Sequence, residues 1–322
     1  MISKAPPRSG DNKISLLPNK GKAFDSVQFN KAAVQMQGDY MVFLTPKERL
    51  PLHALMDAAL SLKSNPKIKL LYGDDDEIQI GGYRSNPDFK ATFDPIRLLN
   101  HNYIGRNFII RRDLFEQLKG FREEENIDVF HDLLIRSSKL LKDEEVLHVP
   151  RILRHRLKSL IPQVEEHNAK RINTIKRNIS LKDWLMSNNK GIFYTRPQNS
   201  SSNQLVSIII PSACKIEFLQ PCISSIFSNT NYKFFEIILI VNEIRYQVPE
   251  QSKFLSELET NQSITIVKYQ DQPFNYSYLI NLGVSHAKGE KICLLNDDIE
   301  IISPNWLDEM LAWLSIPKIG AV

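Results

Sequence analysis

Cysteine is scarce in this chain. Only three of the 322 residues are cysteines, Cys214, Cys222 and Cys293, and no two of them have the paired spacing of a zinc site. The same spacing argues against a disulfide framework. Each cysteine lies among apolar residues, so we expect three buried thiols that act as small hydrophobic side chains.

A strong charge and a long apolar run are also missing. Lys+Arg number 41 against 37 Asp+Glu, and this net charge of +4 is too small to predict nucleic-acid binding. No run approaches the roughly 18 apolar residues that span a bilayer. The first residues, MISKAPPRSGDNK, have no apolar segment typical of a secretion signal. We therefore expect a cytoplasmic protein with no nucleic-acid partner.

Two nucleotide-binding motifs are absent as well. The sequence contains neither G-x-G-x-x-G nor a Walker sequence, so dinucleotide-dependent and P-loop NTPase activities find no support. What is present is an ordinary globular composition, 42% hydrophobic and 24% charged. The length fits two domains, or one large domain, with enough core to fold without disulfides.

Strand-like apolar runs alternate with helical patterns along the chain. Alternation of this kind predicts an α/β fold with a mainly parallel sheet flanked by helices. Residues 217–228 and 304–315 each place apolar side chains on one helical face, and Ser303 and Pro304 suit the start of the second helix. The strand-like runs are 40–44, 68–72, 107–112, 205–210, 236–241, 264–269 and 291–295.

A polar stretch, RPQNSSSNQ at 196–204, is typical of a linker. It divides the chain into a front module, residues 1–195, and a rear module, residues 205–322. We expect these to be separate domains.

A segment of the front module recurs in the rear module. NKAAVQMQGDYMVFLTPKE, which starts at Asn30, aligns without gaps to NLGVSHAKGEKICLLNDDI, which starts at Asn281, an offset of 251 residues. Both copies predict a helix, a glycine-acidic turn and a buried strand. The strand tips differ, because the rear copy has NDD where the front copy has TPK.

Asp297 and Asp298 follow the apolar run 291–295 directly. In open α/β sheets ligands bind beyond the carboxyl ends of the strands, where these two residues are expected. Carboxylate oxygens suit Mg²⁺ or Mn²⁺, which commonly reach a substrate diphosphate through one or two carboxylates. The alternative is a solvated turn whose acidic residues favour the following helix start.

The rear module resembles the first half of a family 2 glycosyltransferase. The resemblance rests on VSIIIPSACKIEFLQPCISSIF at its start and on NYSYLINLGVSHAKGEKICLLNDDIE before the helix. Residues from about 20 to 160 of the front module are similar to the second half of the same domain, through LLYGDDDEIQIGGYRSNPDFKATFDP and HVPRILRH. The chain thus reads as two incomplete copies in inverted order.

This resemblance implies the GT-A fold and inverting transfer of a sugar from a nucleotide-sugar donor to a saccharide acceptor. It implies a divalent cofactor, Mg²⁺ or Mn²⁺, and a role in bacterial surface polysaccharide synthesis. By residue-to-residue transfer, Pro211, Asn242, Asn281 and Asp297 would bind the donor, and Asp298 with Asp297 would hold the metal. Asn242 departs from the family, which commonly has aspartate at this position to read the nucleobase.

The front module departs further from the family pattern. Its metal motif has become TPKE, and Phe130 occupies the position of the usual catalytic base in VFHDL. Asp132 is the remaining carboxylate and our candidate catalytic residue, although the resemblance gives its counterpart a more structural role. The rival hypothesis is a non-catalytic remnant or scaffold that binds carbohydrate or a partner transferase. A third is that the chain is a piece of a longer tandem enzyme.

Two further segments leave alternatives open. The acidic GDDDEIQIGG at 73–82 fails the EF-hand pattern and is either a pocket wall, by resemblance, or a solvated turn. The resemblance also lets His155 touch a metal, although a structural histidine is more common. The basic residues from Arg151 to Lys158, with Lys170, Arg171, Lys176 and Arg177, could meet phosphates or the inner face of a membrane. A solvated helix face is the alternative.

Overall fold

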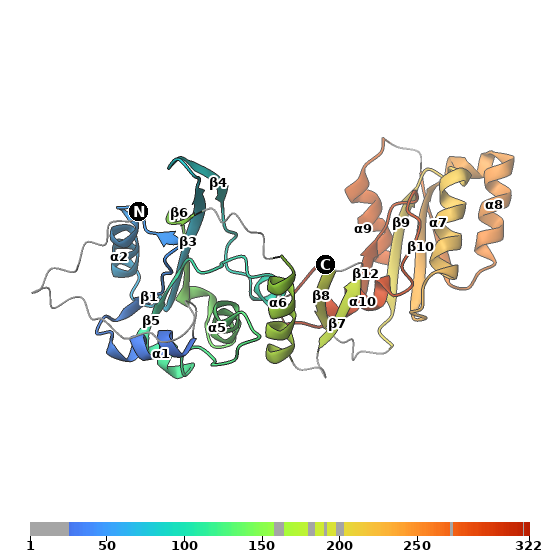
Figure 1. Cartoon of the computed structure of the whole chain (residues 1–322). Helices are drawn as coiled ribbons and strands as arrows, with labels where there is room; N and C mark the ends of the chain where they lie inside the picture. The colour runs from blue at the N-terminus through green and yellow to red at the C-terminus, as the bar shows by residue number, and fades with distance from the viewer. Residues whose placement is uncertain are drawn as a thin grey trace, which may run out of the picture. The chain divides into compact units, whose positions relative to one another are not determined.

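A computed structural model describes residues 26–157, 164–179, 184–189, 192–197, 203–270, 273–317 and 319–322. The chain forms two compact units, one of residues 1–181 with 187–195 and one of residues 182–186 with 196–322 (Figure 1). We call them the front unit and the rear unit. Most of the predicted linker, residues 198–202, lies outside the described residues.

The rear unit contains a four-stranded sheet in the order β11-β10-β9-β12. All of its neighbouring strands run parallel, as the alternation of strands and helices predicts. Its elements are β9 (Val206–Ser212), α7 (Ile216–Ser228), β10 (Phe235–Asn242), the 3-10 helix η2 (Glu243–Gln247), α8 (Pro249–Glu259), β11 (Ile264–Tyr269), α9 (Tyr276–His286), β12 (Lys291–Leu294) and α10 (Trp306–Leu314).

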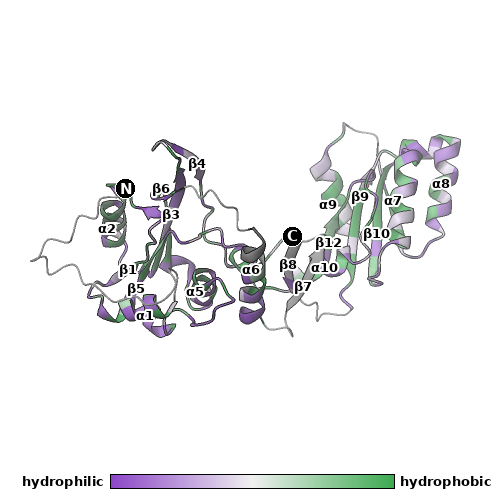
Figure 2. Ribbon diagram, in the orientation of Figure 1, coloured by the Kyte–Doolittle hydropathy of each residue, from purple (hydrophilic) through white to green (hydrophobic). Residues whose placement is uncertain are grey.

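The two faces of this sheet are covered by different helices. Alternate residues of β9 and β10 point to opposite faces, so that Ile208 packs toward α7, α8 and α10 while Ile209 packs toward α9. Figure 2 shows the apolar β9 and β10 beside helices α7 and α8, which carry both apolar and hydrophilic residues. Gly283 of α9 leaves room for this contact, because a Cβ at that position would lie 2.5 Å from the Ile209 side chain.

The front unit is built on a six-stranded sheet, with the order β1-β5-β3-β6-β2 and β4 paired to β3. Its elements are α1 (Ser26–Gln35), β1 (Tyr40–Val42), β2 (Glu48–Arg49), α2 (Ala54–Ser64), β3 (Leu70–Ile78), β4 (Arg84–Asp88), α3 (Pro95–Asn100), β5 (Phe108–Arg111), α4 (Arg112–Gln117), α5 (Val129–Ser138), the 3-10 helix η1 (Asp143–Glu145), β6 (Val146–Leu157) and α6 (Val164–Asn178). A two-stranded sheet of β7 (Trp184–Asn189) and β8 (Ile192–Pro197) follows along the chain.

The front sheet corrects the expectation of a mainly parallel arrangement. Only β3 and β6 run parallel, whereas β5 pairs antiparallel with both β1 and β3, and β2 and β4 are antiparallel to their neighbours. The β3–β4 pair is a hairpin closed by a short link, whereas the partners in the β1–β5 and β2–β6 pairs lie far apart along the chain, so the local alternation of strands and helices does not set their direction. The α/β class itself is confirmed.

Both copies of the repeat fold alike. At the offset of 251 residues, α1 corresponds to α9, β1 to β12 and α2 to α10, with ends that agree within one residue. In each unit the first of these helices packs on one face of the sheet and the last on the other. The repeat predicted from sequence is therefore a helix–strand–helix unit in three dimensions.

Among the helices in the described ranges, none combines the length and the apolar content that a membrane span requires.

Candidate active site

The candidate site of the rear unit lies where its parallel strands end. Pro211 and Ser212 close β9, Asn242 closes β10, and Asp297 and Asp298 come three and four residues after the end of β12. The sheet holds β12 beside β9, and the Leu295 N–H extends this pairing by donating to the carbonyl of Ile209 at 3.0 Å. The carboxyl ends of a parallel sheet are the usual place for a ligand.

Asp297 is fixed by a serine that the sequence analysis did not identify. The Ser212 hydroxyl donates to Asp297 Oδ2 at 2.5 Å, and Ser212 Oγ in turn accepts from the Cys214 N–H at 2.9 Å. Asp297 is half-buried and Asp298 is exposed. One carboxylate is thus oriented by the end of the neighbouring strand while the next faces water. The only signal for Ser212 in the sequence was its position after Pro211.

Asn242 has a structural contact of its own. Its side-chain oxygen accepts from the N–H of Ile244 at 3.0 Å and caps the 3-10 helix η2. Asn242 is buried, and Pro211 is half-buried in β9, paired in register with Ile240. The two predicted donor-binding residues therefore lie at the ends of adjacent strands.

The cysteines of this unit are protonated at neutral pH. Burial raises the pKa of Cys222 to about 11, and the nearby Asp297 carboxylate adds to the shift. Burial also raises the pKa of Cys214, again with a contribution from Asp297. Burial raises the pKa of Cys293 to about 11. Cys214 and Cys222 are buried and Cys293 is half-buried, in agreement with the prediction of structural thiols.

Asn281 lies in the middle of α9 and is exposed. Its counterpart in the front unit, Asn30, shows what this residue type does at this position. Asn30 Nδ2 donates to the Phe121 carbonyl at 2.9 Å, and Asn30 Oδ1 accepts from the Phe121 N–H at 2.9 Å. In the front copy the asparagine holds a loop, so a donor-binding role for Asn281 stays a prediction.

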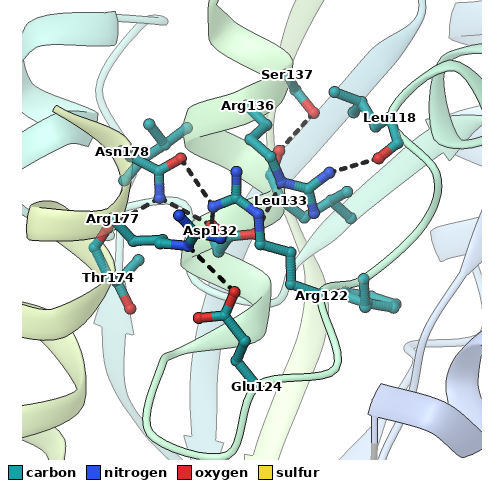
Figure 3. Close-up of polar contacts among 12 residues, drawn as sticks. Leu118, Arg122, Glu124, Asp132, Leu133, Arg136, Ser137, Thr174, Arg177 and Asn178 are labelled. Atoms are coloured by element: carbon teal, nitrogen blue, oxygen red, sulfur yellow. Dashed lines mark hydrogen bonds and ion pairs between the residues drawn. The ribbon is translucent and has the colours of Figure 1, made fainter. Parts of the chain in front are cut away.

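Asp132, the candidate catalytic residue, lies within the front unit near the start of α5 and has no exposed surface. Its Oδ1 accepts from Arg122 Nη1 at 2.6 Å and from Asn178 Nδ2 at 2.8 Å, and its Oδ2 accepts from Arg136 Nε at 2.8 Å (Figure 3). Arg136 also donates to the Leu118 and Gly120 carbonyls. Both carboxylate oxygens therefore serve to hold α5, α6 and the 118–122 loop together.

This geometry argues against Asp132 as a base. A catalytic base must come within hydrogen-bond reach of the acceptor hydroxyl, directly or through one water. A fully buried carboxylate between two guanidinium groups has no such access. The more structural role that the family resemblance gave its counterpart agrees with these contacts. Phe130, at the position of the usual base, is itself buried among aromatic rings, with its ring centroid 5.1 Å from that of Phe121.

A guanidinium group lies beside the altered metal motif of the front unit. Arg154 donates to Glu48 Oε1 at 2.9 Å and to Asp75 Oδ2 at 2.8 Å, and its side chain is almost fully buried. Glu48 belongs to the TPKE segment and also accepts from the Thr45 N–H at 2.9 Å. In the front unit the Arg154 guanidinium thus neutralises the carboxylates of Glu48 and Asp75 beside the altered metal motif.

The buried aspartates of β3 in the front unit are also paired. Asp74, Asp75 and Asp76 lie buried in β3, which excludes the solvated turn for this part of the segment. His148 Nε2 lies 2.8 Å from Asp74 Oδ1, and His155 Nδ1 lies 2.5 Å from Asp76 Oδ1. His155 is therefore a partner of Asp76. The predicted contact of the basic residues with a membrane or phosphates remains a prediction, and Lys158 lies outside the described residues.

The described part of the chain contains no cluster of three or more His, Cys, Asp or Glu side chains arranged to hold a metal ion. Asp297 and Asp298 still fit a hard cation that keeps most of its ligands from water and phosphate, because Mg²⁺ is commonly held by one or two carboxylates. The front unit does not fit such a cation, since its buried carboxylates already have basic partners.

Comparison with known proteins supports the resemblance to family 2 glycosyltransferases. A family model described as glycosyl transferase family 2 matches residues 207–322, which confirms the resemblance for the rear unit. The chain is 27% identical over 320 residues to the O-antigen biosynthesis protein RfbC of Myxococcus xanthus. It is 26% identical over 322 residues to the uncharacterized protein y4gI of Sinorhizobium fredii.

Each alignment covers 97% of this chain, but only 25% of the first relative and 35% of the second. The chain therefore spans about a quarter to a third of the length of these relatives. Among solved structures it is similar to the mannosyltransferase PcManGT of Pyrobaculum calidifontis in complex with GDP-Man and Mn²⁺. That similarity has 17% identity and a TM-score of 0.33, and it covers 37% of this chain and 35% of that one.

Proposed function

We propose that the rear unit of this chain binds the nucleotide-sugar donor of a GT-A glycosyltransferase that acts in bacterial surface polysaccharide synthesis. One observation carries the proposal: Ser212 orients Asp297 beside the exposed Asp298, at the carboxyl end of a parallel sheet. These residues lie within the segment that matches family 2 glycosyltransferases. The relative RfbC of Myxococcus xanthus is named for O-antigen biosynthesis, which supports the pathway class.

The two aspartates take different roles in this proposal. Asp298, which is exposed, would hold Mg²⁺ or Mn²⁺ together with the donor diphosphate. Asp297, restrained by Ser212, would share the metal or accept a ribose hydroxyl. The metal supplies charge stabilisation to the departing diphosphate. Pro211, Asn242 and Asn281 are the further donor-binding candidates.

The front unit does not supply the base in this proposal. Asp132 is enclosed by Arg122 and Arg136, and Phe130 has no proton-accepting group. Inverting transfer to a saccharide acceptor needs a carboxylate that reaches the acceptor hydroxyl. We therefore propose donor binding for the chain as described, and sugar transfer as the activity of the complete site to which it contributes.

The domain assignment belongs to the same proposal. The rear module, 205–322, would be the first half of a glycosyltransferase domain with an acidic metal motif, and the front module, 1–195, the second half of another with a degenerate motif. The strand orders support the assignment of two different halves. The repeated strand is β12 in the rear unit, where it pairs with β9, and β1 in the front unit, where it pairs with β5. The GT-A type follows from the family match.

Isothermal titration of the full chain with UDP, dTDP and GDP tests the function. We expect binding that requires Mn²⁺ or Mg²⁺, disappears with chelator and falls at least tenfold in Asp298→Asn. Glu250→Gln, which alters an exposed carboxylate at the start of α8, is the matched control and should bind normally. Binding that ignores the metal, or equal binding by both variants, would refute the assignment of Asp298.

The second candidate function is that of a scaffold, and the buried pairing of the front unit favours it for that unit. Arg154 lies between Glu48 and Asp75, so this region needs no metal to stay neutral. A scaffold predicts that the front unit contributes nothing to nucleotide binding. If Arg154→Ala lowered the nucleotide affinity while the rear unit stayed folded, the scaffold function would be wrong.

A further inference from the structure

One arginine of the rear unit, Arg245, has a guanidinium group that the fold does not use. Arg245 is half-buried in the 3-10 helix η2, three residues after Asn242, where β10 ends. Its Nε is shielded from water and has no hydrogen-bond partner, and among the described residues no carboxylate forms an ion pair with it. A shielded donor without an acceptor costs free energy, and a bound ligand can supply the acceptor.

The strand pairing places Arg245 on the same edge of the sheet as the oriented aspartate. Val241 of β10 pairs in register with Ser212 of β9, and the Ser212 hydroxyl holds Asp297. Arg245 follows Val241 by four residues. Burial raises the pKa of the Cys214 thiol, the guanidinium of Arg245 opposes this rise, and the Asp297 carboxylate adds to it. A cation and an anion therefore both lie near the loop that follows β9.

The two ends of this edge suit different parts of a nucleotide. In the strand order β11-β10-β9-β12, Arg245 follows β10 and Asp298 follows β12, so that one strand, β9, lies between them. Neighbouring strands are about 4.8 Å apart, which puts β10 and β12 roughly 10 Å apart. A diphosphate held with its metal at Asp298 therefore leaves the nucleobase to reach the end of β10.

The side chains at the end of β10 offer hydrogen-bond donors without a negative charge. Asn242 is uncharged, and its Oδ1 accepts from the Ile244 N–H at 3.0 Å. The guanidinium of Arg245 has only donors, in a rigid fork that matches two neighbouring acceptor atoms. Guanine has such a pair in N7 and O6. Cytosine has one in N3 and O2, whereas uracil and thymine carry the N3–H donor between their carbonyl groups.

We propose that Arg245 contacts the nucleobase of the donor and selects a base with two adjacent acceptor atoms, guanine or cytosine, over uracil and thymine. This inference rests on the proposed donor binding and deepens it. A bidentate contact between arginine and a base discriminates against the wrong base by roughly 5- to 150-fold. A contact of Arg245 with the diphosphate would instead be the same for every base.

Isothermal titration of the full chain with four nucleoside diphosphates in the presence of Mn²⁺ tests the preference. GDP or CDP should bind at least tenfold more tightly than UDP and dTDP. Arg245→Gln should bring the four affinities to within about threefold of one another, by weakening the preferred nucleotide. Arg245→Lys keeps the charge but loses the fork, so it should lose the preference as well. Lys253→Gln, which removes an exposed cation from α8, is the matched control and should keep the preference.

Inorganic diphosphate separates the two ends of the site, because it has no base. Its Mn²⁺-dependent binding should fall at least tenfold in Asp298→Asn and stay unchanged in Arg245→Gln, which also shows that the second variant is folded. Equal binding of the four nucleotides, a preference for UDP or dTDP, or an equal loss of inorganic diphosphate and GDP in Arg245→Gln would overturn the base contact and leave donor binding intact. If no nucleotide bound in a metal-dependent way, the proposed function and this inference would both be wrong.

Discussion

The two copies of the repeat bury opposite faces of the same helix. In the rear unit α10 packs Leu307 and Leu311 into the core, where they are 2% and 4% exposed. The equivalent Met56 and Leu60 of α2 are 61% and 57% exposed. The front helix instead packs Ala54 and Ala58 against β3 and β6. Burial in each copy is thus decided by the strands that the rest of the unit supplies.

This difference separates what the repeat encodes from what its neighbours impose. α10 has Asn305 and Glu309 where α2 has the buried alanines, and Glu309 Oε2 lies 3.4 Å from Arg196 Nη1. Helix α10 is amphipathic and suits a single covered face. Helix α2 is apolar on both faces, as in helices buried between two layers. The composition of α2 is therefore that of a helix covered on both faces.

The largest effect should come from the buried carboxylate of the front unit. Asp132→Ala leaves Arg122 and Arg136 without their shared partner, and removal of one member of a buried ion pair costs about 3–5 kcal/mol. Hydrogen exchange of α5 peptides in urea measures the loss. Glu125→Gln, on the exposed 123–126 loop, is the control. A loss below about 1 kcal/mol would show that the network does not stabilise the unit.

The helix comparison gives the next effect. Leu311→Ala removes a buried side chain and should lower the free energy of unfolding of the rear unit by about 2–5 kcal/mol. Leu60→Ala, at the equivalent position of α2, should change the front unit by no more than about 0.5 kcal/mol. Trp306 and Trp313 lie in α10 of the rear unit, so tryptophan fluorescence reports its unfolding.

The front unit needs its own measurement, by hydrogen exchange of α2 peptides. If Leu60→Ala cost as much as Leu311→Ala, the outward face of α2 would be covered in solution. The comparison between the two helices would then fail.

The sequence predicted local structure better than strand direction. All four strands of the rear sheet and the repeat follow from apolar runs and alternation. The antiparallel placement of β5 did not, because strand direction depends on connections and on partners distant in the chain. For the Asp74–Asp76 segment the sequence left a pocket wall and a solvated turn open for a similar reason. Its partners His148 and His155 come from β6, more than 70 residues later.

The candidate site was predictable in part. Asp297 and Asp298 were identified because acidic residues follow an apolar strand. Ser212 was missed, since its contact with Asp297 spans 85 residues and leaves no local pattern. A catalytic role for Asp132 stays a prediction, and its buried contacts with Arg122 and Arg136 instead favour a structural role.

A smaller effect should come from the serine at the rear site. Ser212→Ala removes the donor to Asp297 and the acceptor of the Cys214 N–H, which should cost about 0.5–1.5 kcal/mol of rear-unit stability. It should also weaken metal-dependent nucleotide binding severalfold, because Asp297 would lose its fixed orientation. Asp297→Asn should remove that binding with little change in stability. The contrast with Asp132, where stability changes most, tests the different roles of the two aspartates.

The smallest effect appears only at alkaline pH and only in the rear unit, which holds all three cysteines. Burial raises the pKa of Cys222 in the folded state to about 11 from an ordinary value near 9. Between these values the unfolded chain releases a proton that the folded unit retains, so stability falls as pH rises from about 9. Cys222→Ala should remove this part of the slope. Urea unfolding followed by tryptophan fluorescence at pH 8 and at pH 10.5 should show the wild type losing stability relative to Cys222→Ala. A constant difference between the two proteins at both pH values would contradict the raised pKa and imply that the thiol reaches solvent.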